Sequence, residues 1–156
     1  MALAAAGESS AAGRLAALVR SLPACRAVVV SDAAAGSDDL PQLLHSVDVL
    51  AVADDSPDEV ALVLQAMSCG VPTVAVDTGV LSDLVAHDVT GLLVRHPGAV
   101  SEALRSLLCD PMRRQGMGLA AVDRVRARFD CAVVGAALER LLLEVVPERS
   151  TAAVAS

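Results

Sequence analysis

Residues 56–72, which read S-P-D-E-V-A-L-V-L-Q-A-M-S-C-G-V-P, constrain the fold more than any other stretch of the chain. Ser56 followed by Glu59 fits a capping box, and Pro57 suits the first position of a helix. Apolar residues then recur at the i, i+3, i+4, i+7 spacing of one helix face, at Val60, Val63, Leu64 and Met67. This pattern predicts an amphipathic helix that begins just after Ser56.

The residues on either side of this helix predict two strands. Gly70 favours a left-handed end to the helix, and Pro72 prevents its continuation. Residues 73–76 are β-branched or Ala, and residues 48–53 (D-V-L-A-V-A) form a similar apolar run before the helix. Such runs fit strands that are buried on both faces of a parallel sheet. Together the three segments predict a β-α-β unit.

The same alternation of strand and helix patterns continues in both directions. Further strands are predicted at residues 26–31 and 91–95. Helices are predicted at residues 10–22, 40–47, 81–87, 99–108 and 112–129, and in a last segment that Asp130 caps and that runs to Val146. This order predicts an α/β fold, a partial doubly wound parallel sheet with C-terminal helices. Residues 1–147 are predicted to form one domain, and residues 148–156 a disordered tail.

The composition excludes several classes of function. The net charge is -7, with 12 arginines and no lysine, and there is one Phe and no Trp or Tyr, so nucleic acid is not an expected partner. The four cysteines lie far apart and lack zinc-ligand spacing, so no metal and no cofactor are expected. Neither a signal peptide nor a transmembrane segment is expected, and the prediction is a cytoplasmic protein.

Several ordered motifs resemble those of one enzyme family. Q-A-M-S-C-G-V-P-T-V-A, V-T-G-L-L-V, L-L-C-D-P-M-R-R-Q-G-M-G and R-V-R-A-R-F are similar to motifs in the C-terminal, donor-binding half of family 4 glycosyltransferases, which are retaining two-domain enzymes of the GT-B fold. Residues 74–94 also run without a gap beside the family's V-A-T-D-V-G-G-I-P-E-V-V-x-D-G-V-T-G-L-L-V. The resemblance covers residues 26–146 and implies the Rossmann-like half of a GT-B enzyme.

The resemblance implies transfer of a hexosyl group from a nucleotide sugar, a UDP- or GDP-sugar, to an unknown acceptor, with retention and without a metal. The family's donor-binding helix reads E-G-F-G-L-x-x-x-E-A-M. Its second glutamate, which binds the nucleotide ribose, corresponds to Gln65, and its first corresponds to Pro57, which cannot replace it. The catalytic residues stay unassigned. The candidate donor-binding residues are Glu59, Val60, Ala61, Gln65, Thr78 and Gly79.

The main candidates also have a purely structural interpretation, and both interpretations stand. Gln65 either binds ribose through its amide or is a polar residue on the exposed edge of the helix. Glu59 either replaces the family's first glutamate or reaches back to the cap at Ser56. Thr78 and Gly79 follow a predicted strand, at the edge where doubly wound sheets bind ligands, but Gly79 also suits a plain turn.

Acidic residues surround the turn where the family has glycines. Asp58 and Val60 stand in place of those glycines, and Asp54 and Asp55 precede the turn. In the family this helix start leaves N–H groups free for the donor diphosphate. Carboxylates stabilise a helix start but compete with an anionic ligand there, and no lysine offsets them. This replacement argues against ordinary catalysis.

The remaining reactive side chains are predicted to be structural. Cys69 is expected to be a core thiol rather than a nucleophile. The three histidines are isolated in sequence and are expected at the surface, at positions His45, His87 and His96. Three arginines of one helix are expected on a solvated face: Arg124, Arg126 and Arg128.

Two functions follow from these observations. The first is a glycosyltransferase donor domain, truncated or one half of a split enzyme, that has little or no activity without a complementary N-terminal domain chain. The second is a non-catalytic protein-interaction module that keeps the fold without the site and associates with another chain or as a homo-oligomer. A receiver domain has a similar sheet, but it needs a lysine that this chain lacks.

Overall fold

The computed structural model describes residues 27–29, 40–52 and 55–145. The strands are β1 (Ala27–Val29), β2 (Val49–Val52), β3 (Thr73–Val76) and β4 (Gly91–Val94). The helices are α2 (Leu40–His45), α3 (Pro57–Ser68), α4 (Gly79–Leu84), α5 (Val100–Cys109), α6 (Pro111–Arg128) and α7 (Cys131–Val145), with a 3-10 turn, η1 (Pro97–Ala99), before α5. The predicted helix at residues 10–22 and the predicted tail at residues 148–156 lie outside the described residues.

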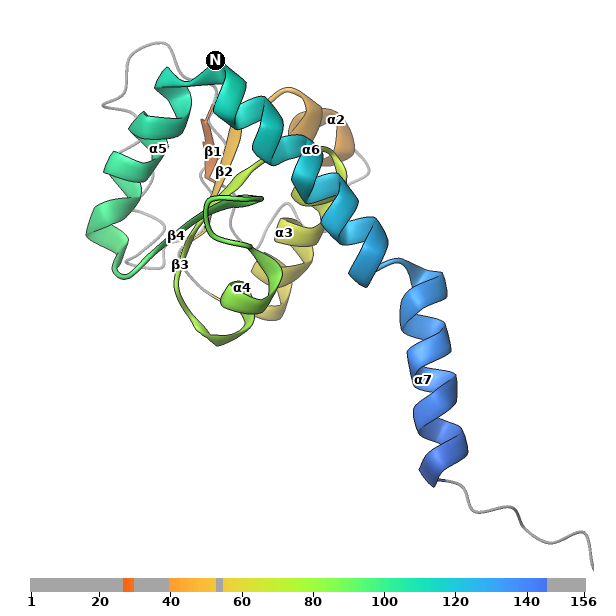
Figure 1. Ribbon diagram of the computed structural model, residues 1–156. Helices are drawn as coiled ribbons and strands as arrows, with labels where there is room; N and C mark the ends of the chain where they lie inside the picture. The colour runs from red at the N-terminus through yellow and green to blue at the C-terminus, as the bar shows by residue number, and fades with distance from the viewer. Residues whose placement is uncertain (1–26, 30–39, 53–54, 146–156) are drawn as a thin grey trace, which may run out of the picture.

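The four strands form one parallel sheet in the order β1-β2-β3-β4 (Figure 1). Leu50 of β2 lies beside Thr73 of β3, and Thr73 lies beside Gly91 of β4. Because the strands are parallel, they all end at one edge of the sheet, the carboxyl edge, and all begin at the opposite, amino edge. The predicted parallel sheet is confirmed.

Helices cover both faces of this sheet. β2 and β3 are buried along their whole length, as their apolar sequences require. Leu50, Val52 and Ala75 point into an apolar cluster with α2, α3 and α4. Val49 and Val74 point to the other face, into a second cluster with α5. The three layers, with α3 and α5 on opposite sides of the sheet in Figure 1, confirm the doubly wound architecture.

The C-terminal end of α3 packs closely against α6. Gly70 has a φ of 75°, the left-handed conformation that the sequence predicts for the end of this helix. A Cβ atom on Gly118 of α6 would lie 2.2 Å from the carbonyl oxygen of Gly70, a distance that no side chain tolerates. The glycines of the motifs C-G-V-P and G-M-G therefore allow these two backbones to meet.

A second close approach joins β3 and β4. A Cβ atom on Gly91 would lie 2.1 Å from the carbonyl oxygen of Thr73. These two residues are partners in the parallel ladder, so the glycine of the V-T-G-L-L-V motif lets β4 begin directly beside β3. Both glycine contacts lie at the amino edge of the sheet.

Arg114 of α6 ties together three parts of the chain. Its Nη1 donates to the carbonyl oxygens of Leu107 at 3.0 Å and Leu108 at 3.2 Å, in the last turn of α5. Its Nη2 lies 3.4 Å from Oδ1 of Asp48, just before β2. The side chain of Asp110 caps α6 by accepting the Arg113 N–H at 3.0 Å.

The prediction that Arg124 lies on a solvated face is wrong. Arg124 is half-buried, and it donates from Nε to the carbonyl oxygen of Leu84 at 2.7 Å and from Nη2 to that of Asp83 at 2.8 Å. A cation at the end of α4 satisfies the last carbonyls of the helix and favours the helix dipole. Arg126 and Arg128 are exposed, as predicted.

The predicted bounds of the helix at residues 81–87 are also wrong. α4 begins at Gly79, which the sequence places in a loop, and it ends at Leu84 because Val85 has an extended backbone, with φ -91° and ψ 117°. His87 lies beyond the helix. Its ring Nδ1 accepts the backbone N–H of Leu93 at 3.0 Å.

α7 follows α6 after a short turn. The side chain of Asp130 accepts the N–H of Ala132 at 2.9 Å, so the predicted cap is confirmed. Figure 1 shows that α7 extends away from the sheet and the helices that cover it. Within the part of the chain that the structure describes, no helix has the length and apolar character needed to span a membrane.

Candidate functional site

The carboxyl edge of the sheet is where a doubly wound fold binds ligands. The chain passes from β2 into α3 and from β3 into α4 at this edge, so the first turns of both helices lie there. Four predicted site residues belong to these turns: Glu59, Val60, Thr78 and Gly79. Ala61 and Gln65 lie further along α3, one turn apart on its exposed side.

The first turn of α3 has little capacity left to bind an anion. The Glu59 N–H donates to Oγ of Ser56 at 3.3 Å, and the Val60 N–H donates to the carbonyl oxygen of Ser56 at 2.9 Å. Pro57 has no N–H. Among the described residues, Asp58 alone in this turn keeps an N–H group without a partner, and it carries a carboxylate itself. The helix start that binds phosphate in many proteins is closed here by the chain's own cap.

The side chains of α3 differ in how far they reach solvent. Glu59 is only 9% exposed, and Val60 packs partly buried against the core cluster that contains α3. Ala61 and Gln65 are exposed. Of the α3 candidates, these two therefore present the surface that a ligand could reach.

The start of α4 is more open. Gly79 is exposed, and a Cβ atom there would meet nothing within 4 Å. The hydroxyl group of Thr78 is buried and has no hydrogen-bond partner among the described residues. Ser82 donates its hydroxyl to the carboxylate of Asp77 and lies 3.1 Å from the carbonyl oxygen of Thr78. The turn offers open space beside a carboxylate.

Charges of both signs lie at the carboxyl edge. Asp55, Asp58 and Asp77 contribute exposed carboxylates. Arg95 and His96 follow β4 directly, and the backbone of Asp77 donates to the carbonyl oxygen of Val94 at 2.7 Å, so the end of β4 adjoins the β3 turn. Sequence reasoning missed these two residues. The signal was available, because a basic residue that ends a predicted strand must lie at this edge.

Reactive and metal-binding groups add little to this edge. In the described ranges, no three His, Cys, Asp or Glu side chains are grouped so that they could hold a metal ion. Cys69 is half-buried and packs against the core, where burial raises the pKa of its thiol. A thiol with a raised pKa is a poor nucleophile.

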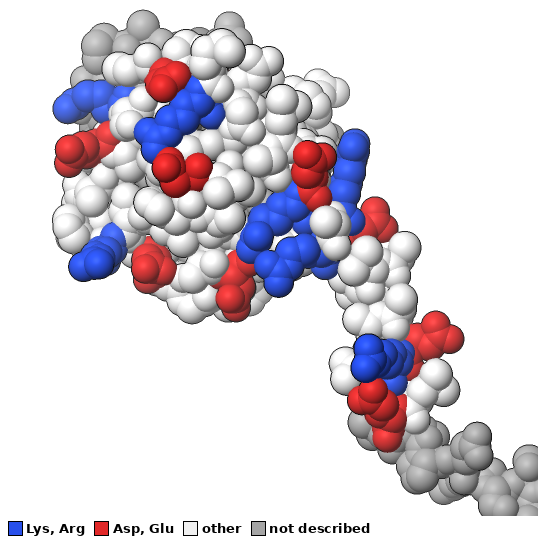
Figure 2. Space-filling model, viewed as in Figure 1, with Lys and Arg blue, Asp and Glu red and all other residues white. Residues whose placement is uncertain are grey.

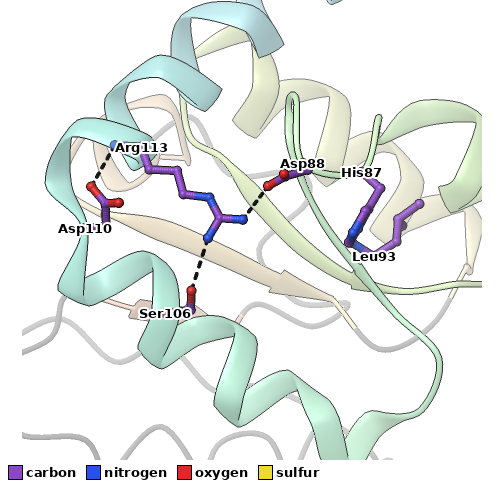
Figure 3. Close-up of polar contacts among 6 residues, drawn as sticks. All are labelled: His87, Asp88, Leu93, Ser106, Asp110 and Arg113. Atoms are coloured by element: carbon purple, nitrogen blue, oxygen red, sulfur yellow. Dashed lines mark hydrogen bonds and ion pairs between the residues drawn. The ribbon is translucent and has the colours of Figure 1, made fainter.

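A separate polar cluster lies at the amino edge (Figure 3). Arg113 pairs with Asp88 and donates to Oγ of Ser106 at 3.2 Å, which joins α6, α5 and the loop before β4. The hydrogen bond from Arg113, together with its charge, lowers the pKa of Asp88. Asp88 has a φ of 63° and stands where the family motif D-G-V-T-G has its glycine. These contacts stabilise the scaffold and lie away from the carboxyl edge.

Comparison with known proteins agrees with this architecture. Residues 2–124 match the sequence model of the family described as "Glycosyl transferases group 1". The chain is 42% identical over 65 residues to a D-inositol 3-phosphate glycosyltransferase of Kribbella flavida. The match covers 40% of this chain and 15% of that protein. It is 37% identical over 81 residues to a GDP-mannose-dependent monoacylated alpha-(1-6)-phosphatidylinositol monomannoside mannosyltransferase of Corynebacterium glutamicum. This match covers 51% of this chain and 21% of that protein.

Two solved structures share the fold. Sucrose-phosphate synthase from Thermosynechococcus elongatus superimposes with a TM-score of 0.64 at 20% identity, over 83% of this chain and 41% of that one. The C-terminal domain of the glycosyl transferase group 1 protein LpcC from Francisella tularensis gives a TM-score of 0.55 at 19% identity, over 67% of this chain and 54% of that domain. The match over residues 2–124 shows that the chain belongs to the group 1 glycosyl transferase family, as its motifs predict.

Proposed function

We propose that this chain acts as the donor-side domain of a glycosyltransferase that transfers a hexosyl group from a UDP- or GDP-sugar to an acceptor hydroxyl. The observation that carries the proposal is the family match over residues 2–124. The mannosyltransferase relative is named as GDP-mannose-dependent, which supports a nucleotide sugar as the donor class. The parallel sheet, with two helix starts at its carboxyl edge, is the architecture that would hold such a donor.

The residues at the carboxyl edge suggest how a donor would be held. Gln65 and Ala61 would meet the nucleoside on the exposed side of α3. Gly79 would let the donor approach the backbone of α4, because its Cα has open space. Arg95 would offer a positive charge to the diphosphate, since the first turn of α3 cannot. Donor affinity in this arrangement is expected to be weak, because three carboxylates share the edge.

Transfer also needs an acceptor side. The chain spans about a seventh and a fifth of the length of the two relatives described above. Catalysis depends on orienting two substrates in a site from which water is excluded. We expect the 156-residue chain by itself to release no nucleotide from UDP-glucose or GDP-mannose in the presence of sugar or inositol acceptors.

Calorimetric titration with UDP, GDP, ADP, UDP-glucose and GDP-mannose tests donor binding directly. Binding that Gln65→Ala and Arg95→Ala each weaken at least tenfold would support the donor site. Gln115→Ala, an exposed glutamine on α6, is the matched control and should leave binding unchanged. Binding of equal strength in all three variants would contradict the placement of the site.

A second function is favoured by one specific observation. The first turn of α3 is closed by Ser56 and Pro57 and lined by Asp55 and Asp58, so it has few N–H groups left to offer a phosphate. This supports a non-catalytic interaction module that keeps the fold. No heat with any nucleotide, from a chain shown to be folded by circular dichroism, would favour the module over the donor domain.

A further inference from the structure

α7 presents a large apolar surface to solvent. Four large apolar side chains of this helix are at least half exposed: Val134 (50%), Leu138 (55%), Leu141 (57%) and Leu142 (54%). The spacing i, i+4, i+7, i+8 places them on one face of the helix, and Cys131 extends the face by one turn. We call these five residues the α7 stripe. Exposed apolar surfaces of this kind mark sites of association.

The charged residues of α7 lie outside the stripe. Glu139, Arg140 and Glu144 are the charged residues between Cys131 and Val145, and Arg140 lies 3.3 Å from Glu144 in an i, i+4 pair. Figure 2 shows the same arm with uncharged surface between a few charged side chains. No charge on this helix therefore opposes the approach of a second apolar face.

We propose that α7 pairs with α7 of a second copy of this chain, in an antiparallel arrangement around a two-fold axis at Leu138. A stripe without charges is complementary to an identical stripe, and a two-fold contact covers both stripes at once. The pairing places Leu138 beside Leu138 and Val134 beside Leu142 of the second copy. The proposal does not rest on the glycosyltransferase function.

Electrostatics favours the antiparallel orientation. Each chain has a net charge of -7, and a parallel pair would bring both bodies to the same end of the helices. An antiparallel pair separates the bodies and opposes the two helix dipoles. It also brings Glu144 opposite Ala132 of the second copy, close to the last turn of α6.

The last turn of α6 carries the complementary charge. Arg126 and Arg128 end this helix, with the carboxylates of Asp123 and Asp130 on either side of them in the sequence. Figure 2 shows blue side chains gathered where the body meets the α7 arm. In the antiparallel pair, the C-terminal end of each α7, which carries Glu144, therefore points at the last turn of α6 in the second copy, which carries Arg126 and Arg128.

The interface is small. A 15-residue helix is about 22 Å long, and one helix from each copy buries less than the roughly 800 Å² per partner of standard complexes. We therefore expect a concentration-dependent dimer that dissociates in the micromolar range.

Sedimentation equilibrium of the full chain tests the dimer. Leu138→Glu places two carboxylates at the two-fold axis and should raise the dimer Kd at least tenfold. Leu143→Glu is the matched control, because Leu143 is 74% exposed on the side of α7 away from the stripe, and it should dimerise like the wild type. A wild-type chain that stays monomeric at every concentration, or equal effects of both substitutions, would overturn the proposal.

Cross-linking tests the orientation. In a background of Cys25→Ser, Cys109→Ser and Cys131→Ser, V134C/L142C should form disulfide-linked dimers rapidly under mild oxidation, because the two positions face each other across an antiparallel pair. V134C alone should not, since position 134 meets itself only in a parallel pair. Rapid linkage of V134C alone would overturn the antiparallel arrangement.

Discussion

The two edges of the sheet differ in how completely their polar groups are used. At the amino edge, the backbones of Gly70 and Gly118 pack closely together, and Arg124 donates to the last carbonyls of α4. Arg113 contacts both Asp88 and Ser106 there. At the carboxyl edge, Gly79 faces open space and exposed carboxylates line the turns. The family motifs that set the fold lie mostly at the first edge, and the departures from the family lie mostly at the second, with Asp88 as an exception. The contacts that set the fold and the candidate site residues therefore lie mostly at opposite edges of the sheet.

The largest expected effect comes from replacing one glycine by alanine at each edge of the sheet and comparing the two changes in stability. Gly91→Ala should lower the free energy of unfolding by about 3 kcal/mol, because the new Cβ would overlap the carbonyl oxygen of Thr73. Gly79→Ala, at the carboxyl edge, should change it by less than ~0.5 kcal/mol. Urea denaturation measures both. Equal effects at the two edges would contradict the comparison.

The arginines of α6 give the next largest effect. Arg124→Met should lower the free energy of unfolding by about 1–3 kcal/mol, since it leaves the carbonyl oxygens of Leu84 and Asp83 without a donor. Arg126→Met is the control. It removes an exposed side chain on the same helix and should have little effect. Thermal unfolding that is equally sensitive to both changes would show that charge alone, rather than the contact with α4, is responsible.

Restoring the family's sequence in the first turn of α3, at the carboxyl edge, should strengthen nucleotide binding. The combined change P57E, D58G, E59F and V60G installs the family sequence E-G-F-G at the start of α3. It adds the backbone N–H that Pro57 lacks and leaves one carboxylate fewer in the turn, so calorimetry should show UDP or GDP binding at least tenfold tighter, which is about 1.4 kcal/mol. Uridine, which has no phosphate, is the control ligand and should gain nothing.

The smallest expected effect concerns Asp88. Because Arg113 lowers the pKa of Asp88 in the folded chain, this carboxylate contributes stability above its unfolded pKa of about 3.9 and loses it as the pH falls through the folded value. Asp88→Asn tolerates the same positive φ, so it should be less stable than the wild type at neutral pH. The difference should disappear in acid. Urea denaturation from pH 7 down to acid measures it, and a gap that persists in acid would contradict the charge-based explanation.

Local signals were sufficient to predict the core of the fold. The cap at Ser56, Pro57 at the first helical position and the stop at Gly70 are all contained in one short stretch, and α3 and its flanking strands follow them. The boundaries of α4 were less predictable. Its residues have weak helical periodicity, and its end depends on the extended backbone at Val85.

Contacts between distant residues could not be read from the sequence. The role of Arg124 depends on the end of α4, 40 residues earlier, and a helical pattern of arginines looks the same whether one of them is solvated or half-buried. The left-handed backbone at Asp88 is hidden for a related reason, because its alignment with a family glycine says nothing about the ion pair with Arg113. At the candidate site, the capping of α3 and the exposed position of Gln65 were predictable from the sequence, whereas the burial of Glu59 required the packing around α3.

The contact of Arg114 with Asp48 spans 66 residues and sets an order for folding during synthesis. β2, α3 and β3 leave the ribosome early. The C-terminal end of α3 has no α6 backbone packed against Gly70 until Gly118 has emerged. The contacts of α6 with Gly70 and Asp48 therefore cannot form until most of α6 has been translated. α7 is translated after that point, so the apolar stripe reaches solvent only when the body that carries it is already complete.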